Sequence, residues 1–289
     1  MTAANPLRVS PAERPEYVLN DADFHRLREL VREHTGIALS DAKRQLVHGR
    51  VVRRLRALGL PGFSEYVRLI ESGESEEIEE FVNAVTTNLT SFFREAHHFQ
   101  YLANEVMPNL ARRNDGSRRF RIWSSACSTG EEPYSTAMVL RECQALLAGH
   151  DVKILATDLD SNVLATAAAG VYPADRLAPL GAVRVGRFFK TCTGSAAGKS
   201  QVTQDIRHLI TFKSLNLMKA WPMRGHFDVI FCRNVVIYFD KPTQKQLFDR
   251  MSALQRPGDI LFLGHAESLY RISEKYDLIG RTIYRRNDQ

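Results

Sequence analysis

The run RFRIWSSA, residues 119–126, sets the fold class of this chain of 289 residues. It is short, apolar and rich in β-branched and aromatic side chains, and similar runs follow at residues 151–160, 226–234 and 259–264. Segments of helix length separate these runs. Strands that alternate with helices in this way indicate a doubly wound α/β sheet.

Two C-terminal segments depart from this alternation. Residues 183–212 alternate polar and apolar side chains around a Gly/Ser/Ala stretch, which predicts a small antiparallel insert at about residues 183–213. Within it, GSAAGKS at residues 194–200 has one residue too few between its glycines for a phosphate-binding loop, so we interpret it as a hairpin tip. Residues 276–278 and 282–285 are typical of a terminal hairpin.

The N-terminal part has a different texture. Apolar residues at helical spacing predict helices capped at Asn20 or Asp21, running from Ser40 to about Leu58, covering residues 63–71, and carrying Phe81 and Val85. A chain of this length suits one domain plus a smaller partner. We therefore expect an all-helical domain over residues 1–90 and an α/β domain over residues 91–289.

Composition narrows the class of protein. No apolar stretch approaches the roughly 18 residues of a membrane-spanning helix, and the first residues lack an apolar export segment. We therefore expect a cytoplasmic protein without direct membrane insertion. The four cysteines form no CxxC pair, which indicates reduced thiols. The formal charge of +6 suits a nucleic acid, an anionic membrane surface or an acidic protein equally well.

Polar residues follow the first two predicted strands, where ligands of open α/β sheets bind. After the first strand, Gly130 precedes Glu131 and Glu132 at the start of a helix whose backbone amides can receive an anionic group. A single glycine makes a poor dinucleotide fingerprint. The second strand ends in ATDLD, where Asp158 or Asp160 is placed to hold a ribose diol, although either alone is typical of a helix cap.

Three further segments add polar chemistry. NLTSFFRE at residues 88–95 crowds polar, aromatic and cationic side chains together after an amphipathic helix, which an ordinary surface loop does not require. CRNVVIYF at residues 232–239 offers the amide of Asn234 and the hydroxyl of Tyr238, and SLNLM at residues 214–218 contributes an asparagine. Each has a structural explanation as a turn former, core residue or surface charge. Together they indicate one ligand cleft.

These segments resemble the chemotaxis-receptor glutamate methyltransferases, the CheR family, over essentially the whole chain. The matching segments, in the family's order, are TNLTSFFREAHHF, ACSTGEEPYS, ATDLD, SLNLM, FCRNVVIYFD and LFLGHAES. The resemblance implies a class I S-adenosylmethionine-dependent methyltransferase with a Rossmann-like doubly wound sheet, an N-terminal all-helical domain that recognises the receptor and caps the cleft, and a small inserted antiparallel β-subdomain. The implied reaction transfers a methyl group from S-adenosylmethionine to the side-chain carboxylate of specific chemoreceptor glutamates, giving glutamyl methyl ester and S-adenosylhomocysteine in chemotaxis adaptation.

The same resemblance implies a set of site residues. The cofactor would be held by Asn88, Thr90, Arg94, Glu132, Asp158, Asn216, Leu217, Arg233 and Asn234. We expect Arg94 and Tyr238 to be catalytic, either by holding the acceptor carboxylate or by shaping the cleft. A glutamate with its ordinary pKa near 4.3 is already an anion at neutral pH, so no general base is required. Catalysis can then depend on placement for in-line displacement.

A basic helix is the candidate for receptor docking. Arg50, Arg53 and Arg54 sit at i, i+3 and i+4 on one helical face, and no acidic residue lies between Asp41 and Glu65. An ordinary solvated face is the alternative. The family's use of this helix favours docking to acidic residues of the cytoplasmic signalling domain of methyl-accepting chemoreceptors. The β-subdomain could also bind a receptor C-terminal peptide by strand addition, which the sequence leaves open.

Other functions and ligands are less well supported. A nucleic-acid methyltransferase would place aromatic stacking faces among its basic residues, but the basic helix is aliphatic between its arginines, so we expect no nucleic-acid partner. A non-catalytic S-adenosylmethionine-binding module would not need Arg94 and Tyr238. The adjacent His97 and His98 diverge in direction and lack a carboxylate at i, i+4, so we expect no metal. A monomer would suffice.

Overall fold

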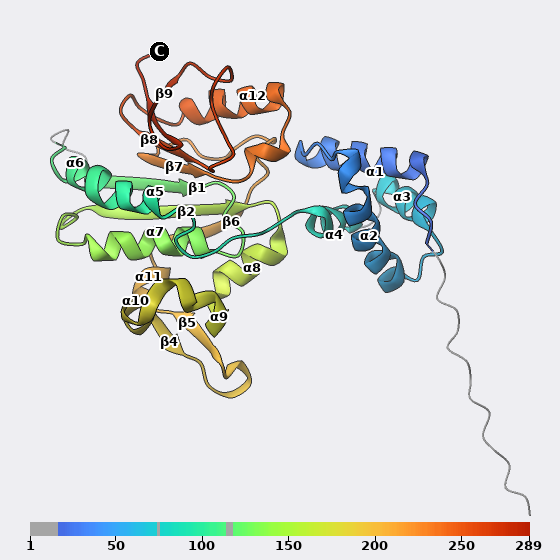
Figure 1. The fold of residues 1–289 in the computed structure, drawn as a ribbon, viewed down its shortest axis with the longest axis horizontal. Coiled ribbons are helices and arrows are strands. Elements are labelled where there is room, and N and C mark those ends of the chain that lie inside the picture. Colours follow the sequence, from blue (N-terminus) through green and yellow to red (C-terminus); the bar gives the residue numbers. More distant parts are fainter. Residues whose placement is uncertain (1–16, 74–75, 114–117) are drawn as a thin grey trace, which may run out of the picture. The chain divides into compact units, whose positions relative to one another are not determined.

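The computed structural model describes residues 17–73, 76–113 and 118–289 (Figure 1). The chain divides into two compact units. The first takes the chain up to Leu30 together with Ser40–Val85, and the second takes Val31–Leu39 and Thr86–Gln289. Among the described residues, no helix has both the length and the apolar character needed to cross a membrane.

The first unit is helical, as the apolar spacing predicts. Its elements are α1 (Asp21–Thr35, whose last residues belong to the second unit), the 3₁₀ turn η1 (Asp41–Lys43), α2 (Arg44–Leu58), α3 (Phe63–Ser72) and α4 (Glu77–Val85). Val47, Val51 and Leu55 recur every four residues along α2 and are fully buried, because this spacing gathers side chains on one face. The left-handed Gly59 ends this helix.

The second unit is built on a mixed seven-stranded sheet in the order β6-β2-β1-β7-β8-β10-β9. Its strands are β1 (Arg119–Ser124), β2 (Asp151–Asp158), β6 (Ile210–Ser214), β7 (Val229–Cys232), β8 (Ile260–Leu263), β9 (Tyr276–Gly280) and β10 (Ile283–Arg286). The first five run parallel, and the C-terminal pair forms the predicted antiparallel hairpin. In register, Ser124 lies opposite Ala156 of β2 and Phe231 of β7.

Helices cover both faces of this sheet. They are α5 (Ala96–Tyr101), the π-helical turn η2 (Leu102–Val106), α6 (Met107–Ala111), α7 (Glu131–Glu142), α8 (Ser161–Ala169) and α12 (Lys241–Ser252), with the 3₁₀ turn η5 (Val236–Tyr238) after β7. Val229 and Phe231 of β7 belong to one hydrophobic core with residues of α5 to α7, whereas Ile230 and Cys232 belong to the other core with residues of α12. In Figure 1, α7 and α12 lie on opposite sides of the large sheet. Burial on both faces explains why the strand sequences read as continuous apolar runs.

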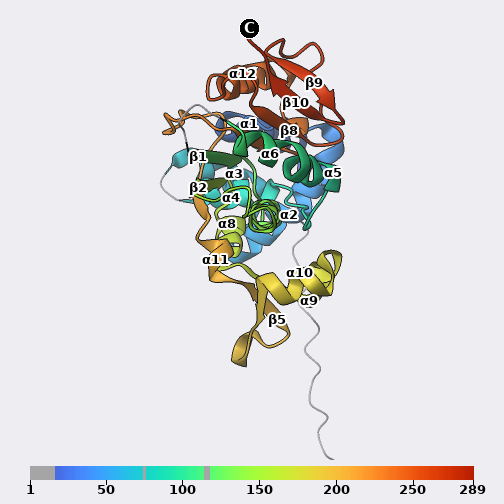
Figure 2. The ribbon, with the colours of Figure 1, turned by 90° about the vertical axis from the view of Figure 1, so that its left-hand side faces the viewer.

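A small antiparallel sheet, β3-β5-β4, is also present, so the expected fold class is confirmed. Its elements are β3 (Val171–Pro173), α9 (Ala174–Leu177), η3 (Ala178–Leu180), α10 (Gly181–Phe188), β4 (Phe189–Thr191), η4 (Gly194–Ala196) and β5 (Lys199–Val202), followed by α11 (Gln204–Arg207). With α9 and α10 it stands apart from the large sheet (Figures 1 and 2).

The bounds of this insert differ from the predicted 183–213. The small sheet begins earlier, at Val171. The sequence analysis did not predict this strand because β3, with three residues, is too short to leave a recognisable pattern. Residues 183–188 are helical rather than extended. At the other end, Ile210–Ser214 joins the large sheet beside β2, with Ser214 opposite Asp158. The run GSAAGKS forms the connection between β4 and β5, as predicted for a hairpin tip.

Candidate functional site

A buried chain of ion pairs lies at the carboxyl ends of β1 and β7. Arg233, the residue after β7, donates from Nη1 to Glu132 Oε2 at 2.9 Å, and its Nη2 lies 3.3 Å from Glu95 Oε2. The same Nη2 donates to the carbonyl of Arg94. Glu132 also accepts from Ser124 Oγ at 2.7 Å, which ties α7 to the last residue of β1. One guanidinium is therefore shared by two carboxylates that have little contact with solvent.

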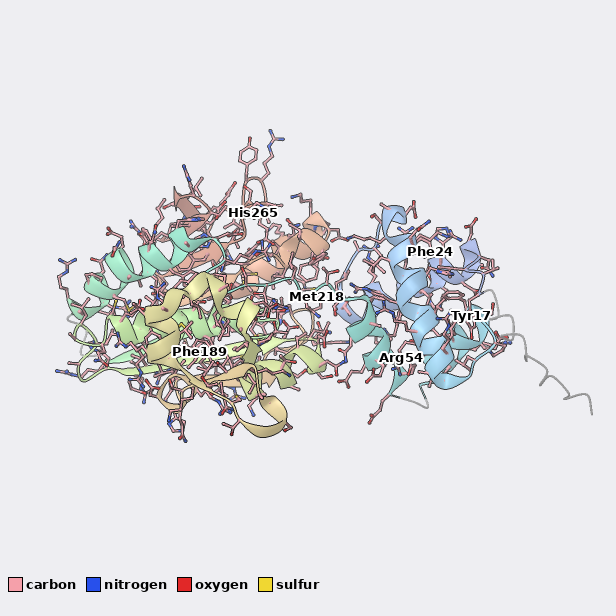
Figure 3. All side chains as sticks on the ribbon, turned by 60° about the horizontal axis from the view of Figure 1, so that its bottom comes forward. Tyr17, Phe24, Arg54, Phe189, Met218 and His265 are labelled. Carbon is pink, nitrogen blue, oxygen red and sulfur yellow. The ribbon has the colours of Figure 1, made fainter. Side chains whose placement is uncertain are left out.

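This environment shifts the pKa values of Glu132 and Glu95 in opposite directions. Burial raises the pKa of Glu132, because the charge of Arg233 only partly compensates for lost hydration. Burial acts in the same sense on Glu95, but the charge of Arg233 and hydrogen bonds from His265 and Asn234 outweigh it and lower the pKa of Glu95 to about 2. His265, labelled in Figure 3, donates to Glu95 from its backbone nitrogen, and its Nδ1 lies 2.9 Å from the same carboxylate oxygen.

The two candidate aspartates at the end of β2 have different roles in the structure. Asp160 is the N-cap of α8, since its Oδ1 accepts from the backbone nitrogens of Asn162 and Val163. Asp158 instead turns toward the loop after β1 and accepts from Ser128 N at 2.7 Å. Burial raises the pKa of Asp158, although backbone hydrogen bonds oppose this. The cap explanation therefore holds for Asp160, which leaves Asp158 as the ligand candidate.

Asn88 is linked to Asp158 through Ser128, which hydrogen-bonds to both residues. Its Nδ2 donates to Asp160 Oδ2 at 2.6 Å, and its carbonyl accepts from Ser128 Oγ at 2.9 Å. In the same run, Phe92 has the structural role that a single phenylalanine suggests, because it is buried against Tyr172 at a ring-centroid distance of 5.0 Å. The NLTSFFRE segment is thus partly core and partly polar edge.

Four predicted site residues are less directly connected. Asn216 uses both ends of its amide: Nδ2 donates to the carbonyl of His34, and Oδ1 accepts from Met218 N. Within the described part of the chain, no hydrogen bond joins the side chains of Thr90, Asn216 and Tyr238 to Glu95, Glu132 or Asp158, and the apolar side chain of Leu217 is buried. Backbone pairing of Leu215 N with the carbonyl of Asp158 nevertheless brings the SLNLM segment to the end of β2.

Two functional candidates escaped the sequence analysis. Glu95 lies within the NLTSFFRE run, and Glu267 lies within LFLGHAES, but neither was singled out. Glu267 is buried and accepts from the backbone nitrogens of Gly264 and Asn234, among others. Glu267 follows the end of β8 by four residues, and the sequence carries no signal that it binds backbone nitrogens of the turn after β7.

The prediction that the arginines of the basic helix have no acidic partners is wrong for Arg54. Arg54 has acidic partners from α4: its Nε and Nη2 donate to Glu77 at 2.8 and 2.6 Å, and its Nη1 lies 3.2 Å from Glu80 (Arg54 is labelled in Figure 3). Arg50 donates to the carbonyl of Ala84 at 2.8 Å. The absence of nearby acids in sequence was misleading, because these acids arrive from residues 77–80. Arg53 remains exposed.

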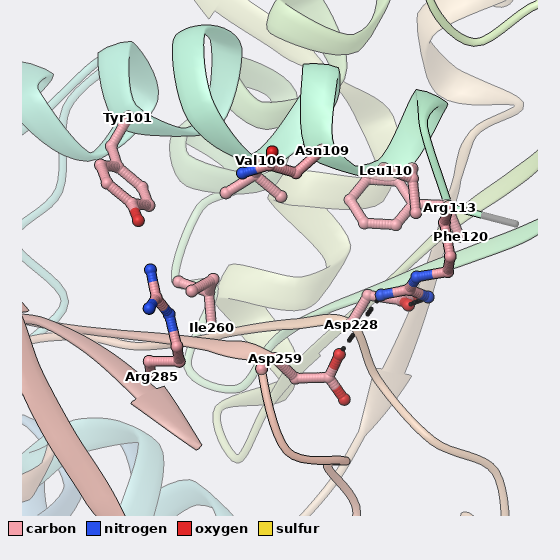
Figure 4. A pocket seen from close by; sticks show the side chains of 11 residues that line it. Tyr101, Val106, Asn109, Leu110, Arg113, Phe120, Asp228, Asp259, Ile260 and Arg285 are labelled. Carbon is pink, nitrogen blue, oxygen red and sulfur yellow. Dashed lines mark hydrogen bonds and ion pairs between the residues drawn. The ribbon is translucent and has the colours of Figure 1, made fainter. Parts of the chain in front are cut away.

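A pocket of about 420 Å³ lies elsewhere in the second unit. Its walls include Phe120 of β1, Asp228 before β7 and Ile260 of β8 (Figure 4). These are the amino ends of parallel strands, the edge opposite to Glu132 and Asp158. Asp228 is held there by Arg113 at 2.5 Å. Because ligands of open α/β sheets bind beyond the carboxyl ends, this pocket does not correspond to the candidate site.

Comparison with known proteins gives a consistent match. Residues 88–285 match the family model described as CheR methyltransferase, SAM binding domain, and residues 22–86 match CheR methyltransferase, all-alpha domain. Chemotaxis protein methyltransferase 2 of Pseudomonas aeruginosa is 46% identical over 284 residues, covering 95% of this chain and 99% of that relative. The chemotaxis protein methyltransferase of Escherichia coli is 43% identical over 268 residues, covering 92% and 91% respectively.

Proposed function

This chain belongs to the CheR methyltransferase family, and from that premise we propose how its residues divide the work. It is an S-adenosylmethionine-dependent methyltransferase of chemotaxis, which is favoured over a nucleic-acid methyltransferase and over a non-catalytic binding module. The substrate that we propose is the side-chain carboxylate of specific glutamates in the cytoplasmic part of bacterial chemoreceptors. The receptor substrate rests on the family match, and the cofactor site rests on the position of Glu132 and Asp158 at the carboxyl ends of the adjacent parallel strands β1 and β2.

The chemistry of the site suits this cofactor. S-adenosylmethionine combines a sulfonium and an ammonium with a carboxylate, a ribose and an adenine. Glu95, Glu132, Asp158 and Glu267 place four carboxylates near the carboxyl edge of the sheet, and Arg233 is the buried cation among them. An excess of negative charge in a poorly hydrated site favours a cationic ligand. Arg233 Nε is also buried without a hydrogen-bond partner among the described residues.

We assign cofactor contacts to the residues that the family resemblance selects. Asp158 would accept from the ribose hydroxyls, because each of its oxygens receives one backbone hydrogen bond and retains acceptor capacity. Glu132 and Arg233 would hold the charged amino-acid portion. The amides would come from Asn88 and Asn234. Thr90, Arg94 and the turn carrying Asn216 and Leu217 would complete the enclosure.

When bound, the cofactor supplies an electrophilic methyl group on its sulfonium. The protein's task is to bring the acceptor carboxylate into line and keep water away. Arg94 and Tyr238 are our candidates for this task. Arg94 Nη1 donates to the carbonyl of Leu89, which holds its guanidinium in place, and the Tyr238 hydroxyl has no hydrogen-bond partner in the described part of the chain. The acceptor is ionised at neutral pH, so positioning rather than proton removal is required.

Receptor docking would use the first unit. Arg53 is the exposed member of the basic set, whereas Arg50 and Arg54 also serve contacts within the unit. We propose that these three arginines meet acidic receptor side chains, that residues 1–90 form the receptor-recognition domain, and that residues 91–289 form the catalytic domain. A receptor C-terminal peptide at the β3-β5-β4 sheet, a monomeric enzyme and a cytoplasmic location complete the proposal.

One assay tests the function as a whole. The protein is incubated with methyl-labelled cofactor and membranes that contain chemoreceptors, and the product is treated with mild alkali. Carboxyl methyl esters release volatile methanol, and we expect this release from the receptor band. Label that resists alkali, or label transferred to added nucleic acid instead, would refute carboxylate methylation of the receptor.

A further inference from the structure

Glu267 binds an unusual concentration of backbone amides. Its Oε2 accepts from Gly264 N at 2.6 Å and Asn234 N at 2.8 Å. Its Oε1 accepts from Val236 N at 2.8 Å and Ile237 N at 3.3 Å. The residue is 5% exposed, so water does little to satisfy these amides or the carboxylate. One buried side chain therefore fastens the loop after β8 to the turn after β7.

The fastened turn has a conformation that needs support. Asn234 has a φ of 57°, in the left-handed region that costs most residues about 1–2 kcal/mol, although asparagine tolerates it better than most. The η5 turn follows directly. Three of the four amides held by Glu267 belong to residues 234–237, between Arg233 and Tyr238. The carboxylate thus stabilises the segment that carries three predicted site residues.

Gly264 shows how close the two loops approach. A Cβ at this position would lie 2.3 Å from Asn234 Nδ2 and 2.8 Å from Glu267 Oε2, distances that atoms do not adopt without displacement. Only glycine leaves room for the Asn234 amide at this point. The side chain of Asn234 is also oriented from the other side, with its Nδ2 3.4 Å from Glu95 Oε1. Asn234 is therefore constrained at its backbone and at its side chain.

We propose that Glu267 is a positioning residue for cofactor binding: it holds the turn of residues 233–238 so that Arg233, Asn234 and Tyr238 face the cleft together. The inference rests on the proposed function and deepens it. The carboxylate oxygens of Glu267 accept hydrogen bonds from four backbone amides, and Glu267 affects the cofactor only by holding these amides in place. Hydrogen bonds to a charged acceptor are stronger than those between neutral groups. Their loss should therefore displace the turn of residues 233–238 and weaken cofactor binding.

The test is Glu267→Gln, which keeps the size of the side chain. A carboxamide has one acceptor oxygen and presents N–H donors to the remaining amides, so it cannot hold both loops. We expect S-adenosylhomocysteine, measured by calorimetry, to bind about tenfold more weakly or worse. The KM for S-adenosylmethionine should rise because Arg233 and Asn234 are displaced, and kcat should fall because the displaced turn also carries Tyr238.

The matched control is Asp259→Asn. Asp259 is 4% exposed, accepts from Arg256 N at 2.6 Å, and directly precedes the strand that Glu267 follows. Both variants lose a buried carboxylate that binds backbone, but Asp259 lies at the amino end of β8. We expect thermal destabilisation from both and weaker cofactor binding only from Glu267→Gln. Equal cofactor affinity in the two variants would overturn the inference.

A second variant covers the case in which Glu267→Gln fails to fold. Gly264→Ala introduces the colliding Cβ and leaves the carboxylate in place, and it should also weaken S-adenosylhomocysteine binding. Wild-type affinity in folded Gly264→Ala would contradict the proposal. The wild-type protein separates the two levels of inference: if it binds no S-adenosylhomocysteine, the proposed function fails, whereas normal binding by wild type and Glu267→Gln alike removes only the role of Glu267.

Discussion

The guanidinium of Arg233 donates to Glu132 over 2.9 Å and so joins the turn after β7 to the first turn of α7. Its second terminal nitrogen lies 3.3 Å from Glu95, which comes from the segment before α5. Three stretches separated by long intervals in sequence therefore meet at one charge. The stability of the site and its suitability for a cationic ligand both depend on this arrangement.

Removing the shared cation should be costly. Arg233→Met leaves Glu95 and Glu132 buried without their partner, and we expect a loss of about 3–5 kcal/mol in the free energy of unfolding, measured by urea denaturation. Arg68→Met is the matched control, because its partner Glu65 lies 2.6 Å away on an exposed helix surface, where such pairs contribute about 1 kcal/mol or less. Similar losses in the two variants would show that the Arg233 cluster is no more than a surface ion pair.

Glu95 should contribute to stability above acid pH. Its pKa falls from an ordinary 4.5 to about 2 in the folded protein, so the unfolded chain takes up the proton first as pH falls. The contribution is therefore complete above pH 4.5 and is lost between about 4.5 and 2. Glu95→Gln should flatten the decline of unfolding free energy over this window, as measured by urea titrations at successive pH values. A decline as steep as that of the wild type would remove Glu95 as its source.

Asp158 should matter for ligand affinity more than for folding. Charged hydrogen bonds are worth about 1.5–3 kcal/mol each, so Asp158→Ala should weaken S-adenosylhomocysteine binding about tenfold or more in calorimetry. Asp228→Ala provides the comparison, because Asp228 also accepts a backbone hydrogen bond, from Arg121 N at 2.8 Å, but lies at the amino edge of the sheet. The Asp228→Ala variant should bind S-adenosylhomocysteine with wild-type affinity. Unchanged affinity in Asp158→Ala would exclude Asp158 from the site.

Charge reversal should separate docking from folding on the basic helix. Arg53→Glu alters an exposed position, so we expect unchanged thermal stability and a raised KM for receptor that depends on salt concentration. Arg54→Glu breaks the pair with Glu77, which is 5% exposed, and should lower the melting temperature as well. Cofactor affinity should be unchanged in Arg53→Glu. A receptor KM that ignores both Arg53→Glu and salt would argue for a solvated face without a docking role.

The sequence predicts much of this fold because the relevant signals are local. Runs such as RFRIWSSA combine apolar and β-branched residues, and their burial on both faces preserves the pattern. The α2 helix is visible because its apolar residues recur at helical spacing on the one face that it buries. By contrast, β3 has three residues, and the polar alternation of residues 183–188 belongs to a helix, so the insert could not be bounded correctly.

The site shows the complementary limit. The local sequence places Asp158 and Asp160 at a strand end, but it was the family resemblance that selected Asp158, and the cap of α8 formed by Asp160 appears only in the structure. Glu95 and Glu267 could not be selected, because their roles arise from partners such as Arg233 and Asn234 that are distant in sequence. Arg54 presents the same difficulty, since Glu77 reaches it from another helix. Composition and spacing reveal which side chains are present near a strand end, but only the folded chain reveals which carboxylate holds which amide or cation.

The central claim is that the carboxyl edge of the large sheet holds the cofactor, and a crystal structure with S-adenosylhomocysteine tests it most directly. We expect the ligand over the ends of β1 and β2, with its ribose hydroxyls bonded to Asp158 and with Asn88 and Asn234 contacting the same molecule. A ligand found instead in the pocket beside Phe120 and Asp228, or one that leaves Asp158 without a contact, would contradict the account.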